Sequence, residues 1–169
     1  MSRRHSSSVR LVAALPLTVL LLALIPAASL ARTRDLSHGT LSVERGRGLV
    51  VLSFRGGVIG AAVHGRVTIS DPVDDGTDAV FSNCDRTREL SDITTLCVGD
   101  DIRFRAVGGR WKVRVSGRGI NLSAVGRGKV LLDGTGDGVP GAFDGFYSLN
   151  GEDALSLPDF PTLLPLAAP

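Results

Sequence analysis

The chain carries two copies of one sequence pattern, and this internal repeat constrains its fold more than any other feature. Residues 41–54 align without a gap with residues 102–115. The match continues at the same constant offset, where Ile59 aligns with Ile120. One copy alone would leave its apolar face uncovered, so the repeat predicts one supersecondary unit used twice around a shared core.

Residues 1–31 have the pattern of a secretory signal peptide. Arg3, Arg4 and Arg10 form a basic start, residues 11–26 form an apolar stretch, and the small residues of Ser29-Leu30-Ala31 form a cleavage site. The apolar stretch is shorter than the ~20 residues that a membrane span requires. We therefore predict cleavage after Ala31, secretion, and no membrane span in the mature protein.

The charge balance excludes one class of partner. The predicted signal peptide carries three of the 19 Lys and Arg residues and none of the 17 Asp and Glu residues, which leaves 16 basic residues against 17 acidic ones. Proteins that bind nucleic acid depend on an excess of positive charge, which this chain lacks after cleavage. Only Lys112 and Lys129 are lysines, and this preference for arginine indicates a GC-rich bacterial source.

The two cysteines predict a disulfide. Cys84 and Cys97 lie near each other in the sequence, and no histidine lies near them to complete a metal site. An even number of cysteines in an exported protein favours a crosslink, which would contribute roughly 3 kcal/mol by closing a loop of this length. The alternative is a pair of buried free thiols.

Both copies have the alternation of a β-hairpin. If Gly108-Gly109 is a two-residue turn, Phe104 falls opposite Val113 and the apolar residues of both strands share one face. The first copy obeys the same count around Arg47-Gly48. Outside the signal peptide, no segment has the apolar spacing of a helix. The sequence therefore predicts an all-β protein.

The predicted architecture consists of duplicated β-hairpin units that form a small antiparallel sandwich or a partly closed barrel, and the sequence does not choose between the two. The expected organisation is a signal peptide (1–31), a duplicated all-β domain (32–154) and a Pro-rich apolar tail (155–169). Within the domain we expect repeat 1 (about 40–71), an excursion with one short strand (72–100), repeat 2 (about 101–133) and a final hairpin (134–150).

One loop has the residues of a calcium site. In the segment 133–144, oxygen-bearing side chains occupy loop positions 1, 3, 5 and 12, and Gly138 occupies position 6. The segment resembles the calcium loops of thrombospondin type 3 repeats and dockerins, although Gly141 stands where the thrombospondin repeats carry Asp. The resemblance implies calcium as a cofactor, with ligands Asp133, Thr135, Asp137, the carbonyl of Val139, and Asp144. The alternative is a Gly-rich hairpin loop with solvated acids.

The same hairpin count predicts a basic face. It places Arg103 opposite Arg114 and Arg105 opposite Lys112 on the outer side of the second copy. Like charges directly opposite one another destabilise a sheet, so a compensating anion is expected. The candidate partner is an acidic glycan or another acidic polymer of the cell envelope. The alternative is pairing with Asp and Glu of the same chain.

No motif of a known catalytic centre occurs in the sequence. His38 and His64 are the only histidines after the signal peptide, and neither lies in a catalytic or metal-binding context. The hairpin count directs Trp111 into the core. We therefore predict a secreted, non-catalytic binding or structural module with no catalytic residues. The alternative is a small secreted hydrolase that uses two carboxylates, as glycosidases do.

Overall fold

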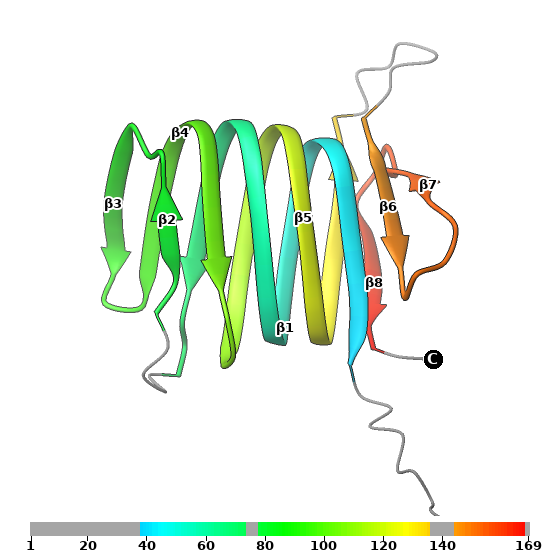
Figure 1. Cartoon of the computed structure of the whole chain (residues 1–169), viewed down its shortest axis with the longest axis horizontal. Helices are drawn as coiled ribbons and strands as arrows, with labels where there is room; N and C mark the ends of the chain where they lie inside the picture. The colour runs from blue at the N-terminus through cyan, green and yellow to red at the C-terminus, as the bar shows by residue number, and fades with distance from the viewer. Residues whose placement is uncertain (1–37, 74–77, 136–143, 168–169) are drawn as a thin grey trace, which may run out of the picture. The chain divides into compact units, whose positions relative to one another are not determined.

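The computed structural model describes residues 38–73, 78–135 and 144–167, so the predicted signal peptide lies outside the described residues. The described residues form an antiparallel sheet without helices (Figure 1), which confirms the all-β prediction. They therefore contain no helix that is long and apolar enough to cross a membrane. The strands are β1 (Gly39–Ser70), β2 (Val80–Ser82), β3 (Arg86–Ser91), β4 (Thr94–Ala106), β5 (Arg110–Gly134), β6 (Phe146–Leu149), β7 (Leu155–Ser156) and β8 (Thr162–Leu166).

The two long strands β1 and β5 wind around each other as an antiparallel pair. Val115 of β5 pairs on one side with Val50 and on the other side with Val67, which lies further along β1. Because each β5 residue in this central part meets β1 twice, the stretch of β1 from Val50 to Val67 makes one full turn of the winding. Figure 1 shows these turns side by side.

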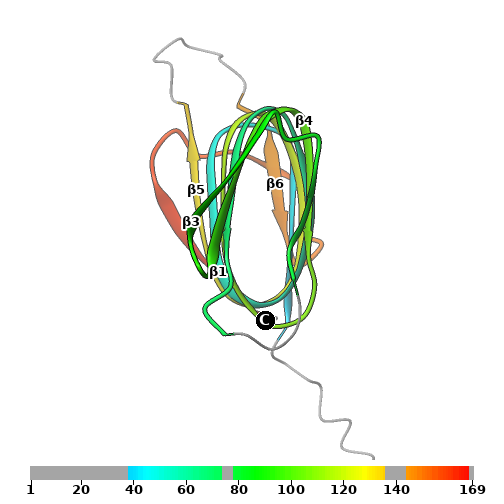
Figure 2. The ribbon, with the colours of Figure 1, turned by 90° about the vertical axis from the view of Figure 1, so that its left-hand side faces the viewer.

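The winding is flattened into two layers, which Figure 2 shows end-on as two walls. Side chains alternate between the inside and the outside along each strand. The sheet is not closed into a barrel, and its arrangement is consistent with a sandwich or a partly open barrel. Layer A contains, in spatial order, β8, residues 128–134, 48–55, 110–117, 65–70 and 94–99, and β3. Layer B contains, in the same direction, β7, β6, residues 39–46, 118–126, 56–64 and 100–106, and β2.

Glycines allow the long strands to pass from one layer to the other. Gly56 has φ 149° and Gly117 has φ 148°, in the region that favours glycine. A Cβ atom on Gly56 would lie 2.1 Å from the carbonyl oxygen of Val125, and one on Gly117 would lie 2.1 Å from that of His64. The glycines also pair with one another across strands, in two rows where the strands pass between the layers. One row contains Gly134, Gly48, Gly117, Gly65 and Gly99, and the other contains Gly39, Gly126 and Gly56.

The strand pairing within each copy differs from the hairpin prediction. Phe104 pairs with Gly60, and Val113 pairs with Leu52 and Ile69, so β4 and β5 are not hydrogen-bonded to each other. In the first copy no turn occurs at residues 47–48, because β1 is continuous there. A corner between two layers has the same glycine signal and the same alternation as a hairpin turn, and this similarity explains the error.

The inward residues of both layers form one hydrophobic core. Leu52, Val113 and Trp111 are at most 1% exposed. The indole Nε1 of Trp111 donates a hydrogen bond to the carbonyl of Gly108, which satisfies the one polar atom of this side chain. Each buried Val or Leu contributes about 1.5–3 kcal/mol. The prediction that Trp111 belongs to the core is confirmed.

The two copies follow the same course through the layers. Repeat 1 runs through layer B (39–46) and layer A (48–55), and then once more through layer B (56–64) and layer A (65–70). Repeat 2 takes the same course through layer B (100–106), layer A (110–117), layer B (118–126) and layer A (128–134). The match is imperfect after the second corner. Ile59 is 60% exposed, whereas the aligned Ile120 is fully buried. Each copy therefore covers the apolar face of the other by winding with it.

The excursion and the tail extend the layers at opposite ends of the winding. Residues 72–100 contain β2, β3 and the beginning of β4, which is more strand than the sequence predicted. Cys84 and Cys97 form a disulfide, as predicted, and it joins the start of this β3–β4 hairpin to the core. The tail packs as an extended strip, because β8 pairs with residues 128–132 and Leu166 is fully buried.

Candidate anion-binding face

Three arginines lie side by side at one margin of layer A. Arg55 of β1 pairs on one side with Arg110 and on the other side with Arg127, both of β5. Adjacent strands are about 4.8 Å apart, so the three side chains start at nearly this spacing. Like charges directly opposite one another destabilise a sheet. The winding of the two copies therefore creates a row of positive charge that the sequence order does not reveal.

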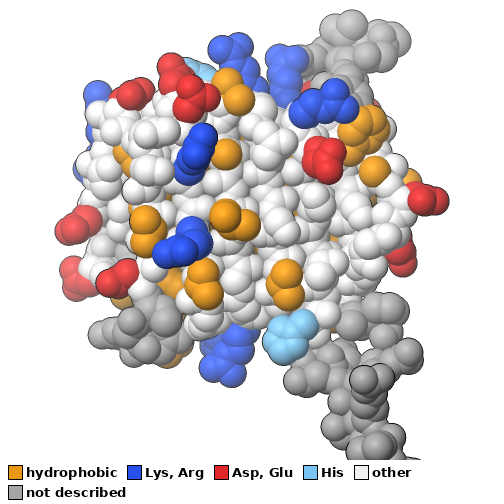
Figure 3. Space-filling view, viewed as in Figure 1, with side chains coloured by type: hydrophobic (Ala, Val, Ile, Leu, Met, Phe, Trp, Pro, Cys, Tyr) orange, Lys and Arg blue, Asp and Glu red, His pale blue; other side chains and the backbone are white. Residues whose placement is uncertain are grey.

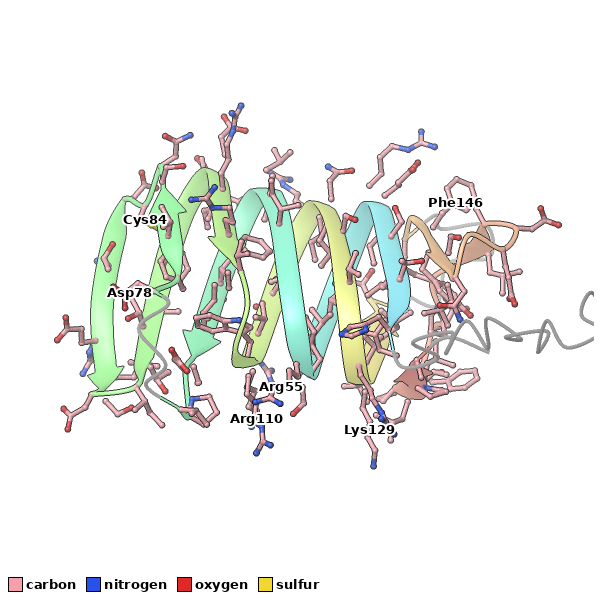
Figure 4. The ribbon with its side chains drawn as sticks, turned by 60° about the horizontal axis from the view of Figure 1, so that its bottom comes forward. Arg55, Asp78, Cys84, Arg110, Lys129 and Phe146 are labelled. Atoms are coloured by element: carbon pink, nitrogen blue, oxygen red, sulfur yellow. A yellow bond between two sulfur atoms is a disulfide. The ribbon has the colours of Figure 1, made fainter. Side chains whose placement is uncertain are left out.

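The neighbouring rows of layer A continue this positive charge. Two residues further along the strands, Ser53 lies between Lys112 and Lys129, and in the next row Arg114 lies beside Val51. All the cations of these three rows are exposed. We define the basic face as Arg55, Arg110, Arg127, Lys112, Lys129 and Arg114. Figure 4 shows Arg55 and Arg110 close together, and Arg55, Arg110 and Lys129 all point away from the ribbon.

The basic face lacks neutralising partners in the part of the chain that the structure describes. None of its six side chains forms a salt bridge with a described residue. The outer residues in the same rows are neutral apart from Arg88 of the edge strand β3, and Asp133 lies one row beyond Arg114. The outer side of layer A is therefore strongly basic, although the chain has nearly balanced charge.

The structure separates the four cations that the sequence analysis placed together. Lys112 and Arg114 lie on the outer side of layer A, whereas Arg103 and Arg105 of β4 lie on the outer side of layer B. The predicted pairing of Arg103 with Arg114 is therefore wrong, because it depended on the hairpin register. Sequence reasoning missed Arg55, Arg127 and Lys129, which only the register between β1 and β5 brings to the same face.

More than half of the acidic residues lie in one segment of the chain. Nine of the 17 acidic residues lie in residues 71–101, and Figure 3 shows red side chains at the end formed by β2, β3 and β4. Asp71, Asp78 and Asp92 line a cavity of about 630 Å³ beside Trp111. Asp78 and Asp92 are exposed. These two carboxyl groups therefore lack the apolar enclosure of a glycosidase acid.

The predicted calcium loop is only partly described. Asp137 and Val139 lie outside the described residues. The hydroxyl of Thr135 donates a hydrogen bond to Oδ1 of Asp144 (2.6 Å), and Asp144 is only 5% exposed. Among the described residues, no group of three or more His, Cys, Asp or Glu side chains could hold a metal ion. Calcium binding therefore stays a prediction.

Comparison with known proteins gives no relative, since no family model, curated protein or solved structure matches the chain.

Proposed function

We propose that this protein is a non-catalytic binding module that holds an acidic glycan on its basic face. The observation that carries this proposal is the exposed row Arg110, Arg55 and Arg127, in which three cations meet across adjacent strands without an ion pair to any described residue. Such a row costs stability in the absence of a ligand. A repeating anion would remove that cost.

The geometry of the basic face favours an extended ligand. Its cations recur about every 4.8 Å across the strands and about every 6.7 Å along them. A polymer with a charge on each unit can engage several of these side chains at once. Four of the six cations are arginines, whose planar guanidinium groups bind carboxylates with two parallel hydrogen bonds.

The same face disfavours nucleic acid. Proteins that bind single-stranded nucleic acid place aromatic side chains between the cations. In the basic face, the residues between the cations are only aliphatic or small and neutral. The near balance of charge in the whole chain agrees with this argument. A carboxylate polymer fits the arginine-rich face better.

The test is the binding of polygalacturonate, measured by isothermal titration calorimetry at low and at high salt. We expect saturable binding that weakens steeply with salt, because exposed charges are screened beyond ~8 Å at physiological ionic strength. The double variant Arg55→Ser/Arg110→Ser should lose at least tenfold in affinity. Its melting temperature should be unchanged or slightly higher, because a like-charge contact is removed.

The matched control removes the same charge from the opposite face. Arg103→Ser/Arg105→Ser should bind polygalacturonate within about twofold of the unmodified protein. An equal loss in both double variants would mean that only net charge matters, and it would overturn the proposal. Binding of polyphosphate without binding of polygalacturonate would overturn the assignment to a glycan.

One feature supports the alternative that the protein is a hydrolase: the cavity lined by Asp71, Asp78 and Asp92. Hydrolysis would shorten polygalacturonate during incubation. A constant polymer length over a day favours the binding module, and shortening that stops in Asp78→Asn or Asp92→Asn favours the hydrolase.

A further inference from the structure

The outer side of layer B carries a shallow groove, which is more apolar than the basic face. The groove has a volume of about 520 Å³ and crosses β1, β5, β4 and β2. This volume lies within the range of small-molecule sites. Its floor is low because it contains small residues. Ser42 pairs with Ser123 across the strands, and Ala61 lies in the next row, between Asn121 and Arg103.

Aliphatic side chains flank one of the two cations of the groove. Ile59 pairs with Arg105, and Arg105 pairs with Val80 on its other side. Ile59 is 60% exposed and Val80 is 51% exposed, although both are apolar. Branched aliphatic side chains gain free energy when a ligand removes them from water. The groove therefore offers an apolar surface around a positive charge.

A second cation lies beside the first. Arg103 is two residues from Arg105 on β4, so the two side chains leave the same face about 6.7 Å apart. Neither guanidinium group forms a salt bridge with any described residue, and Asp101, the preceding outward residue of β4, is beyond salt-bridge distance. Figure 3 shows this face, most of which is coloured white or orange and therefore carries no charge.

We propose that this groove binds a small amphipathic anion, a carboxylate with an aliphatic chain. The carboxylate is held by Arg103 and Arg105, which supply charge-assisted hydrogen bonds. The chain lies along Ile59 and Val80 and over the small residues of the floor. Glu44 lies at the far side of the groove, where it disfavours a second anionic group. This site is independent of the basic face, because it lies on the other layer.

Decanoate is the probe, and binding is followed by the shifts of backbone amide signals in two-dimensional NMR. We expect saturation with a dissociation constant of about 0.1 mM, which is modest because the groove is open. The shifts should be confined to the strands of layer B. Butyrate has the same head without the chain and should bind at least tenfold more weakly. Decyltrimethylammonium has a chain of the same length with the opposite charge and should also bind at least tenfold more weakly.

Variants separate the head from the chain. Arg103→Gln/Arg105→Gln should weaken decanoate binding at least tenfold, and Ile59→Ser should weaken it about fivefold. The control Arg110→Gln/Arg114→Gln removes two charges from the basic face and should leave decanoate binding unchanged. Equal binding of decanoate and decyltrimethylammonium, retained affinity in Arg103→Gln/Arg105→Gln, or no saturation below 5 mM would each overturn the proposal. None of these results bears on polygalacturonate binding.

Discussion

The two copies of the repeat share a pattern of buried apolar residues and glycine corners in their layer A segments but carry different outer residues there. In the alignment of the copies, the buried Leu52 corresponds to the buried Val113, and the corner Gly56 corresponds to the corner Gly117. The outer residues of the same layer A segments differ: Leu49, Val51, Ser53 and Arg55 in the first copy correspond to Arg110, Lys112, Arg114 and Ser116 in the second. The inner pattern therefore defines the fold, and the outer pattern defines the surface.

This difference explains how a duplicated chain acquires a site that neither copy contains. The second copy supplies Arg110, Lys112 and Arg114, and the first copy supplies Arg55 between Arg110 and Arg127. A pair of separate hairpins would keep the cations of each copy apart. Because the copies wind together, cations from both copies form one row.

The largest predicted effect comes from the corners, and it tests whether the two copies are equivalent. Gly56→Ala and Gly117→Ala should each destabilise the domain by more than about 4 kcal/mol, because the new Cβ would overlap a carbonyl oxygen of the neighbouring strand at a positive φ. Urea unfolding followed by tryptophan fluorescence measures both variants.

The chain offers a matched control for this prediction. Gly57 lies beside Gly56, but a Cβ on Gly57 would have no atom nearer than 3.6 Å. Gly57→Ala should change stability by less than about 1 kcal/mol. If Gly56→Ala and Gly117→Ala differ by several kcal/mol, the two corners are not equivalent and the comparison of the copies fails.

A smaller effect is expected at the segment that separates the copies. The disulfide Cys84–Cys97 closes a loop within this insertion, which has no counterpart in the repeat. Cys84→Ala/Cys97→Ala should lower the free energy of unfolding by roughly 3 kcal/mol, since the crosslink constrains the unfolded chain. Differential scanning calorimetry with and without reductant measures the difference. Two free thiols in the unreduced, denatured protein would contradict the premise.

The sequence predicted the strands well because strand alternation is a local property. Val113 and Trp111 were assigned to the inner face from the alternation of their strand, and both are buried. The pairing of strands is not local. The same glycines satisfy a hairpin turn at Gly108-Gly109 and a corner between layers, so the choice depends on long-range packing that a single sequence does not contain.

The candidate site shows the same limit. Lys112 and Arg114 were correctly placed on one outer face, since they lie two residues apart on one strand. Arg103 and Arg105 were wrongly added because their position depended on the hairpin register. Arg55 and Arg127 could not be assigned to this face from the sequence, because the length of one turn of the winding determines that they lie beside each other.

The measurement that most directly tests the account is a cysteine crosslink between the copies. Ser42 of β1 pairs with Ser123 of β5, and antiparallel partners have Cα atoms about 4.5–5.5 Å apart, within the range of a disulfide. In a hairpin around Arg47-Gly48, Ser42 would instead face Ser53. Mild oxidation followed by peptide mapping should show a crosslink in Ser42→Cys/Ser123→Cys and none in Ser42→Cys/Ser53→Cys. The opposite result would contradict the winding of the two copies and, with it, the shared basic face.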